Sequence, residues 1–373
     1  MKSQRQIFWL ICFVVLGMVC ANFVYGQPKS LPGYSGDTWL LELHDGRRYA
    51  GRIEFEDDTD LLVTRRGGRL TKLKPSDVKR RKRLSLGFTP VTPRKLREKL
   101  QREFGSKYTV SLTSHFVVVH PPGDYQKFAM PFEQLYVRFK AWLATRGMTI
   151  DEPEFPLVAV VLRTRAEFDR MSSKRELGDN VVGYYAHSSN RLITYQTDYA
   201  WLDAAANWKE TADTIVHEAV HQTASNCGVH SRVFATPVWV AEGLATTFEA
   251  DGINNYFAHP EFNDRINWDR LKSLRRLYAS GRADGRLGSL VTGDALFKSD
   301  PETAYALSWA LTFYLSQQQP KNYVAYLAAM QRDEAFSAAS GGMRMKYFES
   351  AFGSPEKMEG SIKAFVQSLP EKR

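Results

Sequence analysis

Cysteine is scarce in this sequence. The chain has 3 cysteines among 373 residues, and Cys12 and Cys20 both fall inside an apolar N-terminal stretch. Cys227 is therefore alone in the remainder of the chain. A single cysteine forms neither an intramolecular disulfide nor a cysteine-ligated zinc site. These absences exclude a disulfide-stapled fold, and a chain of this length has instead enough residues for two or three domains with a sizeable core.

A long apolar run stands at the N-terminus. Residues 1–6 carry two positive charges, and residues 7–25 are almost wholly apolar. Residues 24–26 then stand where a signal peptidase reads small side chains, so the pattern predicts a signal peptide over residues 1–26. The run is also long enough to be an uncleaved membrane anchor. In both cases we expect the rest of the chain to be exported, to the periplasm, the cell surface or the medium.

Acidic residues are scarce in one segment of an otherwise balanced chain. The formal net charge is +9, and residues 65–107 hold sixteen Lys or Arg against three acids, which leaves −4 for the remainder. The densest part is the run Lys79, Arg80, Arg81, Lys82 and Arg83. Such a run is either a solvated surface or an attachment to an anionic surface. Because aromatic residues are not interleaved with it, we expect no specific nucleic-acid binding.

Residues 37–85 predict a small all-β domain. Short strand-like segments alternate with turn signals, of which Asp45-Gly46 and Gly67-Gly68 are typical of hairpins. The stretch resembles the SH3-like barrel of the Sla homology type in its "DGR" turn, its "F" strand and its "PSDV" end. The resemblance implies a domain that binds or spaces rather than catalyses. Residues 86–105, with two prolines and a charged helix, are expected to form a basic linker.

Residues 106–370 predict an α+β domain. Strand-like and helical segments alternate as far as a hairpin over residues 181–198, which turns at Ser189-Asn190. After residue 203 nearly the whole chain has a helical pattern. A small mixed sheet followed by a helical body is an α+β arrangement.

The motif HEAVH at residues 217–221 is the strongest functional signal. It lies on a helix predicted over residues 203–226, which Gly228 ends. His217 and His221 are one turn apart on one face, so both imidazoles can reach one metal ion. Glu218 is rotated to the side, where it can act on a water without ligating the metal. On its own, the five-residue pattern fits a solvated histidine pair equally well.

A catalytic zinc ion also needs a third protein ligand and an open position. A second helix is predicted with Thr236 as its cap, Pro237 in its first turn and Gly252 beyond its end. It carries Glu242, which lies 21 residues after His221. The intervening loop, residues 227–236, is long enough to bring Glu242 back to the two histidines.

With both ligand segments present, the sequence resembles the gluzincin metallopeptidases, in which HExxH is followed downstream by a liganding glutamate. More narrowly, it is similar to an uncharacterised bacterial domain family of the same MA-like clan. The resemblance spans residues 106–350 and is carried by "EFPLVAVVLRTRAEFDR", "VVGYY", "TIVHEAVHQ", "HSR", "PVWVAEGLATTFE" and "YALSWAL". It implies a zincin-like fold and an exported zinc peptidase.

The chemistry of this ligand set assigns the main roles. His217, His221 and Glu242 would hold one Zn²⁺ per chain and leave it a net positive charge, which makes a bound water acidic near neutral pH. Glu218 is expected to take that proton as general base and to pass it to the leaving amine. Gluzincins place an oxyanion tyrosine at a distance past the ligand comparable to that of Tyr305, which makes Tyr305 the candidate donor. A packed core tyrosine is the alternative for Tyr305.

The hairpin and two acids supply further candidates. Strand 191–198 is expected to be the sheet edge along which a peptide substrate pairs. Asp213 and Glu249, at helical spacing from the ligands, are candidates to bind the far imidazole nitrogens. The hairpin tyrosines Tyr184, Tyr185 and Tyr195 are expected to face the substrate. Tyr184, Tyr185 and His187 are alternatives to Tyr305 as the oxyanion donor.

One absence narrows the activity. The gluzincin aminopeptidases carry an acid that holds the substrate amino terminus, whereas the corresponding stretch here, "VGYYAHSSN", has none. An endopeptidase or processing enzyme is therefore favoured. A non-catalytic, zinc-stabilised envelope binding protein is the alternative, although a structural zinc site needs no general base and has no open position.

The remaining histidines lack ligand spacing to the motif, and we expect no site role for them: His115, His120, His230 and His259.

Overall fold

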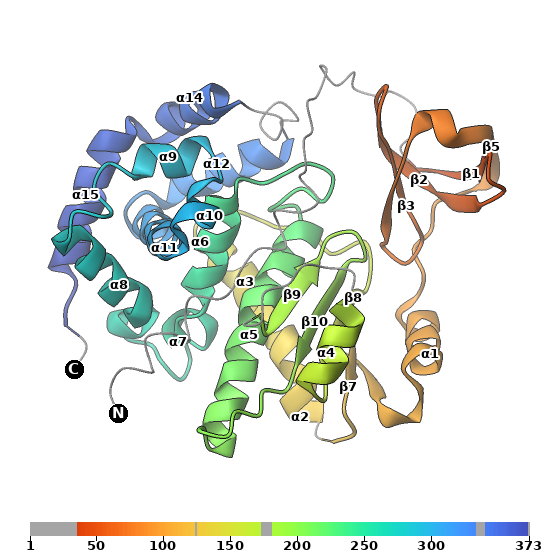
Figure 1. The fold of residues 1–373 in the computed structure, drawn as a ribbon, viewed down its shortest axis with the longest axis horizontal. Helices are drawn as coiled ribbons and strands as arrows, with labels where there is room; N and C mark the ends of the chain where they lie inside the picture. The colour runs from red at the N-terminus through yellow and green to blue at the C-terminus, as the bar shows by residue number, and fades with distance from the viewer. Residues whose placement is uncertain (1–35, 124, 173–180, 333–339, 372–373) are drawn as a thin grey trace.

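Three parts follow one another along the chain: an antiparallel sheet, a mixed sheet with helices on both faces, and a helical body (Figure 1). The computed structural model describes residues 36–123, 125–172, 181–332 and 340–371. The expected leader, residues 1–26, lies outside them. Within the described residues, no helix combines the length and the apolar character needed to cross a membrane. The expected α+β class is confirmed.

The N-terminal domain, residues 36–88, is a five-stranded antiparallel sheet with the order β4-β3-β2-β1-β5. Inward-facing aliphatic side chains from alternate positions, such as Leu41 and Leu43, form its core. The expected turns Asp45-Gly46 and Gly67-Gly68 separate β1 from β2 and β3 from β4. The strands are β1 (Asp37–Leu43), β2 (Arg48–Glu56), β3 (Leu61–Thr64), β4 (Leu70–Leu73) and β5 (Val78–Gly87), and the 3₁₀ turn η2 (Pro75–Asp77) precedes β5.

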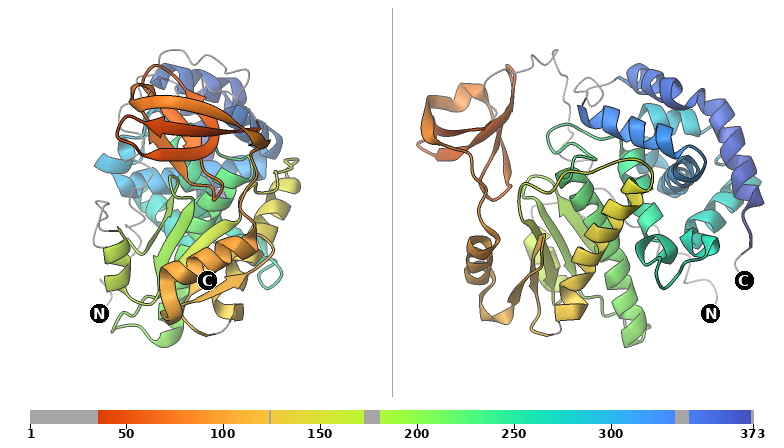
Figure 2. Two further views of the ribbon diagram at one scale, coloured as in Figure 1. Left: turned by 90° about the vertical axis from the view of Figure 1, so that its right-hand side faces the viewer. Right: turned by 180° about the vertical axis from the view of Figure 1, so that it is seen from behind.

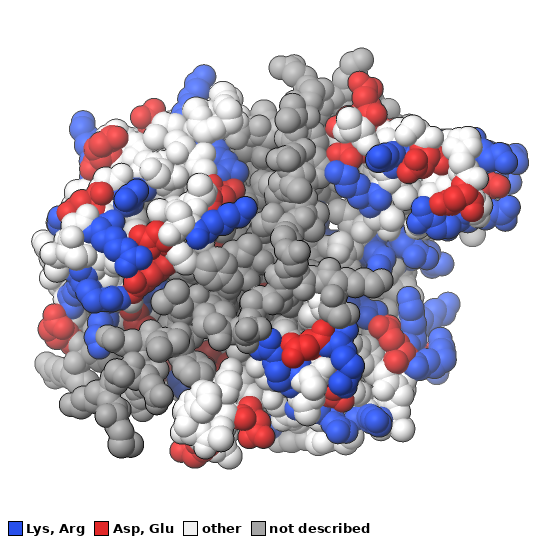
Figure 3. Space-filling view, in the orientation of Figure 1, with Lys and Arg blue, Asp and Glu red and all other residues white. Residues whose placement is uncertain are grey.

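The basic run of residues 79–83 lies on β5, which pairs with β1 along its length. Two of the five cations are neutralised within the domain. The guanidinium of Arg81 donates to both carboxylate oxygens of Glu56 at 2.5 and 2.7 Å, and that of Arg83 donates to Asp37 at 2.8 Å. Figure 3 shows Lys and Arg side chains gathered at the outer end of this domain and along the helix that follows it, with acids between them.

That helix, α1 (Pro93–Phe104), is not a free linker. Leu96 and Leu100, one turn apart, are buried in the core cluster formed with the second sheet. The outward face carries the basic residues, and Thr92 caps the first turn. Residues 93–104 therefore belong to the packed domain, in contrast to the linker predicted over residues 86–105.

The second sheet has the order β6-β7-β8-β10-β9. Strand β8 is parallel to both β7 and β10, while β6 and β9 are antiparallel to their neighbours. The prediction that the second hairpin strand forms the edge is wrong, because β10 pairs with β8 and leaves β9 outside. The strands are β6 (Thr109–Leu112), β7 (Phe116–His120), β8 (Leu157–Leu162), β9 (Gly183–Ala186) and β10 (Arg191–Tyr195).

Helices cover both faces of this sheet (Figure 2). One face packs on α1 and α4, and the other packs on α3 and α5. All six residues of β8 are buried, as expected for a central strand that is covered on both sides. The helices in this part are α2 (Tyr125–Phe128), α3 (Met130–Ala144), α4 (Arg165–Ser172) and α5 (Ala204–Asn226), and the 3₁₀ turn η3 (Gly105–Lys107) follows α1.

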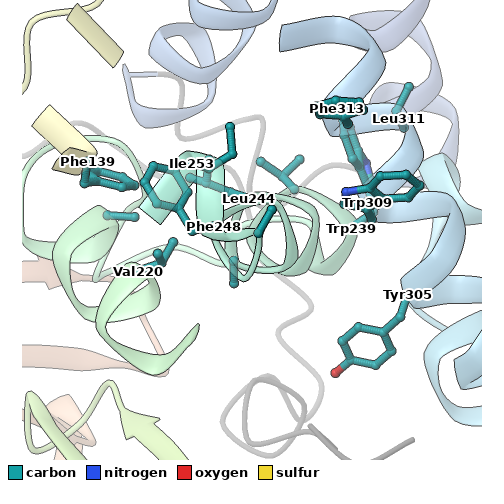
Figure 4. Packing of buried hydrophobic residues seen from close by; sticks show 14 of the residues in the cluster. Phe139, Val220, Trp239, Leu244, Phe248, Ile253, Tyr305, Trp309, Leu311 and Phe313 are labelled. Atoms are coloured by element: carbon teal, nitrogen blue, oxygen red, sulfur yellow. The ribbon is translucent and has the colours of Figure 1, made fainter. Parts of the chain in front are cut away.

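The helical body shares one hydrophobic core with the α3–α5 face of the sheet. Figure 4 shows how Val220 of α5, Leu244 and Phe248 of α6, and Trp309 of α11 contribute to that core. The elements are α6 (Val238–Phe248), α7 (Asp251–Asn254), η4 (Phe262–Arg265), α8 (Trp268–Ala279), α9 (Leu287–Thr292), α10 (Leu296–Ser299), α11 (Pro301–Gln318), α12 (Pro320–Arg332), α14 (Gly341–Phe352) and α15 (Pro355–Ser368).

The limits of α6 differ from the predicted ones. Pro237, not Thr236, occupies the cap position, because its ψ of 132° is extended. The amide of Val238 is satisfied from elsewhere in the fold, by the carboxylate of Asp294 at 3.2 Å. The helix ends at Phe248, and Gly252 lies inside the separate short helix α7. The N-terminal end is thus stabilised by a tertiary contact, which local sequence does not encode.

Candidate metal centre

Helix α5 carries the HEAVH motif through the middle of the protein. Asp203 caps it by accepting a hydrogen bond from the amide of Ala206 at 2.8 Å, and the helix continues to Asn226 as predicted. Every residue from Ile215 to Ser225 is buried, because this part packs against the second sheet, α3 and α6. Burial on all sides holds the two histidine side chains in fixed positions.

Helix α6 brings the third candidate ligand. It packs between α5 and the long buried helix α11. A Cβ atom on Gly243 would lie only 2.5 Å from the carbonyl oxygen of Ser308 in α11 and would also collide with the hydroxyl of Thr312. Glycine beside Glu242 therefore permits the close approach of the two helices. This approach fixes how far Glu242 reaches toward α5.

The three expected ligands meet. His217, His221 and Glu242 are all buried, and one ligand atom from each lies within 4.8 Å of the others. The two Nε2 atoms are 3.2 Å apart. Oxygens of Glu242 lie 3.2 Å from Nε2 of His217 and 3.6 Å from Nε2 of His221. Two basic nitrogens and a carboxylate thus converge on one point.

This geometry fits a tetrahedral metal site. Ligand atoms about 2.0–2.1 Å from a tetrahedral zinc ion are about 3.3–3.4 Å from one another. The two Nε2 atoms are 3.2 Å apart, and the contacts of the Glu242 carboxylate, 3.2 Å through Oε2 and 3.6 Å through Oε1, lie on either side of that value. Oε2 of Glu242 is buried and has no hydrogen-bond partner among the described residues. A buried carboxylate oxygen without a donor fits a site in which a cation is its partner.

Charge supports the same interpretation. Burial alone would raise the pKa of Glu242, but His221 and His217 outweigh burial and lower that pKa to about 2. The carboxylate is therefore ionised at neutral pH. Among the described residues, no fourth His, Cys, Asp or Glu joins this group of ligand atoms. The site offers three ligands.

Glu218 is beside this group but not part of it. It is buried, and Oε2 accepts a hydrogen bond from the backbone amide of Tyr185 in β9 at 2.7 Å. Burial raises the pKa of Glu218, while the imidazoles of His217 and His221 oppose the rise. The amide of the edge strand thus orients the carboxylate that the sequence predicts to be the general base.

Glu249 supports His217 from behind. Its Oε1 lies 2.8 Å from Nδ1 of His217, and its Oε2 accepts from Asn267 at 2.8 Å. Arg270 lies 4.0 Å from Oε2. Burial opposes ionisation, but Arg270 and His217 lower the pKa of Glu249. A charged Glu249 holds the proton of His217 on Nδ1. The lone pair is then on Nε2, the nitrogen that faces the other two ligands.

Asp213 does not take the equivalent position. Its carboxylate accepts from the ammonium of Lys209 at 2.9 and 3.0 Å, one turn earlier on α5. Burial raises the pKa of Asp213 to about 6. Of the two predicted supporting acids, the structure therefore places Glu249 against a histidine and pairs Asp213 with a lysine.

The candidate tyrosines are distributed over several places. Tyr184 and Tyr195 point to the sheet face covered by α1 and α4, where both pack on Phe168. Tyr185 points to the α5 face, and its hydroxyl donates to Asn190 at 2.7 Å. Tyr305 is buried on α11 against Phe297, and the guanidinium of Arg270 lies 5.1 Å from its ring centre. Figure 4 shows its hydroxyl pointing away from the labelled apolar cluster.

The N-terminal domain contacts the rim of this region. The guanidinium of Arg232, in the loop after α5, donates to the carbonyl oxygens of Gly68 at 2.6 Å and His187 at 3.1 Å. The amide of Leu70 donates to the carbonyl of Ser188 at 2.8 Å. One guanidinium therefore joins the β3–β4 turn, the β9–β10 turn and the loop that follows the motif helix.

Several of these residues were not predicted from the sequence. Asn267 is recognisable as a helix cap, since its side chain accepts from the amide of Arg270 at 3.2 Å, but its bond to Glu249 has no local signal. Asn226 bonds to Asn190 at 2.8 Å and ties the hairpin turn to α5. His230, expected to have no role, is buried beside the candidate ligands.

Comparisons with known proteins give similarity without a function. No curated protein matches the chain. A solved structure described as "The crystal structure of a functionally unknown conserved protein mutant from Bacillus anthracis str. Ames" is similar, with 11% sequence identity and a TM-score of 0.36 over 92% of this chain and 70% of that chain. Residues 211–337, which include His217, His221 and Glu242, match the family described as "Protein of unknown function (DUF1570)".

Proposed function

We propose that this protein is a zinc-dependent peptidase of the gluzincin type. The observation that carries the proposal is the convergence of His217, His221 and Glu242 beside a carboxylate, Glu218, that stays outside the ligand group. A purely structural zinc site would use four protein ligands and would need no such neighbour. The site combines three ligands with a base, as hydrolysis requires.

Each residue of the site has a part in the proposed reaction. Zinc held by the three ligands would supply a Lewis acid and make water acidic near neutral pH. Glu218 takes the proton of the attacking water and later delivers it to the leaving nitrogen. The Tyr185 amide keeps the Glu218 carboxylate oriented, and Glu249 keeps the His217 ring in the required tautomer.

The edge strand β9 supports an extended peptide as substrate. It is an edge strand of the sheet and contacts α5. The amide of Tyr185 in this strand donates to Glu218. Backbone pairing along an edge strand recognises a polypeptide without regard to its ends. With no acid in residues 182–190 to hold a substrate amino terminus, an endopeptidase or processing enzyme is favoured.

We also propose an identity for the N-terminal domain, a role for the basic residues and export of the chain. The strand order β4-β3-β2-β1-β5, with a 3₁₀ turn before the last strand, supports an SH3-like identity for the N-terminal domain. The cations of β5 and α1 support attachment to an anionic surface, and the exposed members of the run on β5 are Lys79, Arg80, Lys82 and Arg83. The apolar leader in the sequence supports export.

The test separates metal binding from catalysis. Glu218→Gln keeps the side-chain size and lies outside the ligand group, so zinc content should match the wild type. Hydrolysis of any peptide or protein that the wild type cuts should fall at least about a hundredfold, because general-base catalysis contributes about 10²–10⁴-fold. Wild-type turnover in this variant would refute the assigned base. A wild type that holds zinc and cuts nothing in a broad peptide screen would favour the non-catalytic binding protein.

A further inference from the structure

His230 is a buried histidine, and one of its ring nitrogens lacks a hydrogen-bond partner among the described residues. The side chain is 5% exposed. Its Nε2 is buried and has no hydrogen-bond partner among the described residues. A buried polar group that is left unpaired destabilises the folded state, because it has lost its hydrogen bonds to water. Native proteins rarely accept that cost, so an unpaired buried group calls for a ligand or a functional reason.

The chain is bent so that His230 returns to the metal group. Gly228 has a φ of +74°, a left-handed conformation that ends α5. The amides of Val229 and His230 then both donate to the carbonyl of Ala224, at 3.1 and 2.9 Å. His230 is thereby held against the helical turn that follows His221.

The imidazole is near enough to two of the candidate ligands, His221 and Glu242, to interact with them electrostatically. The titratable groups that act on it are His221, His187 and Glu242. Burial, reinforced by His221 and His187, lowers the pKa of His230 to about 3. An imidazole has at least one N–H group in its neutral and in its protonated form, so His230 can donate a hydrogen bond. Yet His230 is not a member of the group whose ligand atoms lie within 4.8 Å of one another.

The other buried histidine outside the motif shows what a structural histidine has in this fold. His120 is 1% exposed, and both ring nitrogens are bonded, Nε2 to the hydroxyl of Ser111 at 2.8 Å and Nδ1 to the carbonyl of Pro121 at 2.7 Å. His230 resembles His120 in burial but differs in its unpaired Nε2 and in its position beside the ligands.

We infer that His230 is a catalytic residue, whose Nε2–H donates a hydrogen bond to the substrate carbonyl oxygen and to the oxyanion formed from it. This inference rests on the proposed peptidase function. It assigns to His230 the role for which the sequence suggested Tyr305, whose ring is instead held between Phe297 and Arg270.

The reaction balances without any proton transfer by His230. Water adds to the carbonyl carbon, its proton passes to Glu218, and the carbonyl π electrons move to the oxygen. When the C–N bond breaks, the electrons return to re-form the carbonyl, and the leaving nitrogen receives the proton from Glu218. His230 keeps its own proton throughout, and its hydrogen bond strengthens as charge develops on the oxygen.

The test measures a carbonyl-containing probe as well as turnover. Cobalt-substituted wild type, His230→Leu, His230→Asn and His230→Gln are titrated with acetohydroxamate, and the cobalt absorption band reports binding. Leu removes the donor and Asn is too short to reach, so both should bind at least about tenfold more weakly, which corresponds to one lost hydrogen bond. Gln retains a donor of similar reach and should recover part of the affinity. Metal content should be unchanged in all three.

Turnover of a cut substrate should fall in parallel, with kcat/KM lower by about 10²–10³-fold in the Leu and Asn variants. His120→Leu is the matched control, since it should lower thermal stability and leave probe affinity unchanged. Unchanged acetohydroxamate affinity in His230→Asn would overturn the inference whether or not a substrate is known. Loss of metal from the His230 variants would also overturn it and make His230 a fourth ligand. Failure of the proposed function alone appears differently, as weaker probe binding in a protein that cuts nothing.

Discussion

The Nδ1 atom of His217 lies 2.8 Å from Oε1 of Glu249, and the other oxygen of the same carboxylate accepts from Asn267. Glu249 therefore sets the tautomer of a metal ligand without binding the metal itself. Removing such a carboxylate typically costs 10–100-fold in metal affinity.

We accordingly expect Glu249→Ala to raise the zinc dissociation constant about 10–100-fold, as measured by competition with a chromogenic chelator. Asp213→Asn is the matched control, because Asp213 lies at helical spacing from the same histidine but bonds to Lys209. Its zinc affinity should stay within a few-fold of the wild type. Equal losses in the two variants would mean that general electrostatics, rather than the Glu249 contact, controls the site.

Removing the ligands should remove the metal while the fold persists. His217→Ala, His221→Ala and Glu242→Ala should each lose most of their zinc by elemental analysis. The surrounding core joins the sheet, α5, α6 and α11, so circular dichroism should change little. A chelator should lower the Tm of the wild type, because zinc binds only the native state, and should leave the Tm of the three variants unchanged. A full zinc complement in Glu242→Ala would exclude it as a ligand.

Because α6 and α11 are in close contact, adding one methyl group at Gly243 should lower both stability and zinc affinity. Gly243→Ala places a methyl group 2.5 Å from the carbonyl oxygen of Ser308, so the helices must move apart. Overpacking of this kind costs about 1–3 kcal/mol. Since Glu242 is the neighbouring residue, zinc affinity should fall together with the free energy of unfolding measured in urea.

Gly360→Ala is the corresponding control. Gly360 lies in α15, and no atom lies within 4 Å of the position that an alanine methyl group would take, so alanine should stabilise the helix by about 0.5–1 kcal/mol. Gly243→Ala with wild-type stability and zinc affinity would show that α6 is free to shift, contrary to the close approach described above.

Helical periodicity and a short loop were enough to predict the three metal ligands and the base. His217, Glu218 and His221 are related by positions on one helix, and the loop to Glu242 is short enough that few arrangements remain. Periodicity could not choose between Asp213 and Glu249, because both have helical spacing. The choice is made by α8, whose cap residue Asn267 holds Glu249 in place.

Helical periodicity could not predict the order of the strands in the sheet or the reversal of the chain at Gly228. Both strands of the β9–β10 hairpin consist mostly of apolar and aromatic residues, so composition does not distinguish them. The edge position follows from the pairing of β10 with β8, a contact between distant segments. The sequence predicts no role for His230, because its spacing to HEAVH is not that of a metal ligand. The left-handed turn at Gly228 breaks the helix and makes that spacing irrelevant.

The contact between the N-terminal domain and the second sheet limits where the chain can be divided. Arg52 donates to both oxygens of Glu154 at 2.6 and 2.7 Å, and Phe55 packs edge-on against Phe234 with ring centres 5.7 Å apart. A fragment that begins at residue 106 would lose these partners and would uncover the apolar surface that Leu96 and Leu100 of α1 protect. The smallest soluble, protease-resistant piece should therefore begin ahead of β1, and the two domains should melt in a single transition.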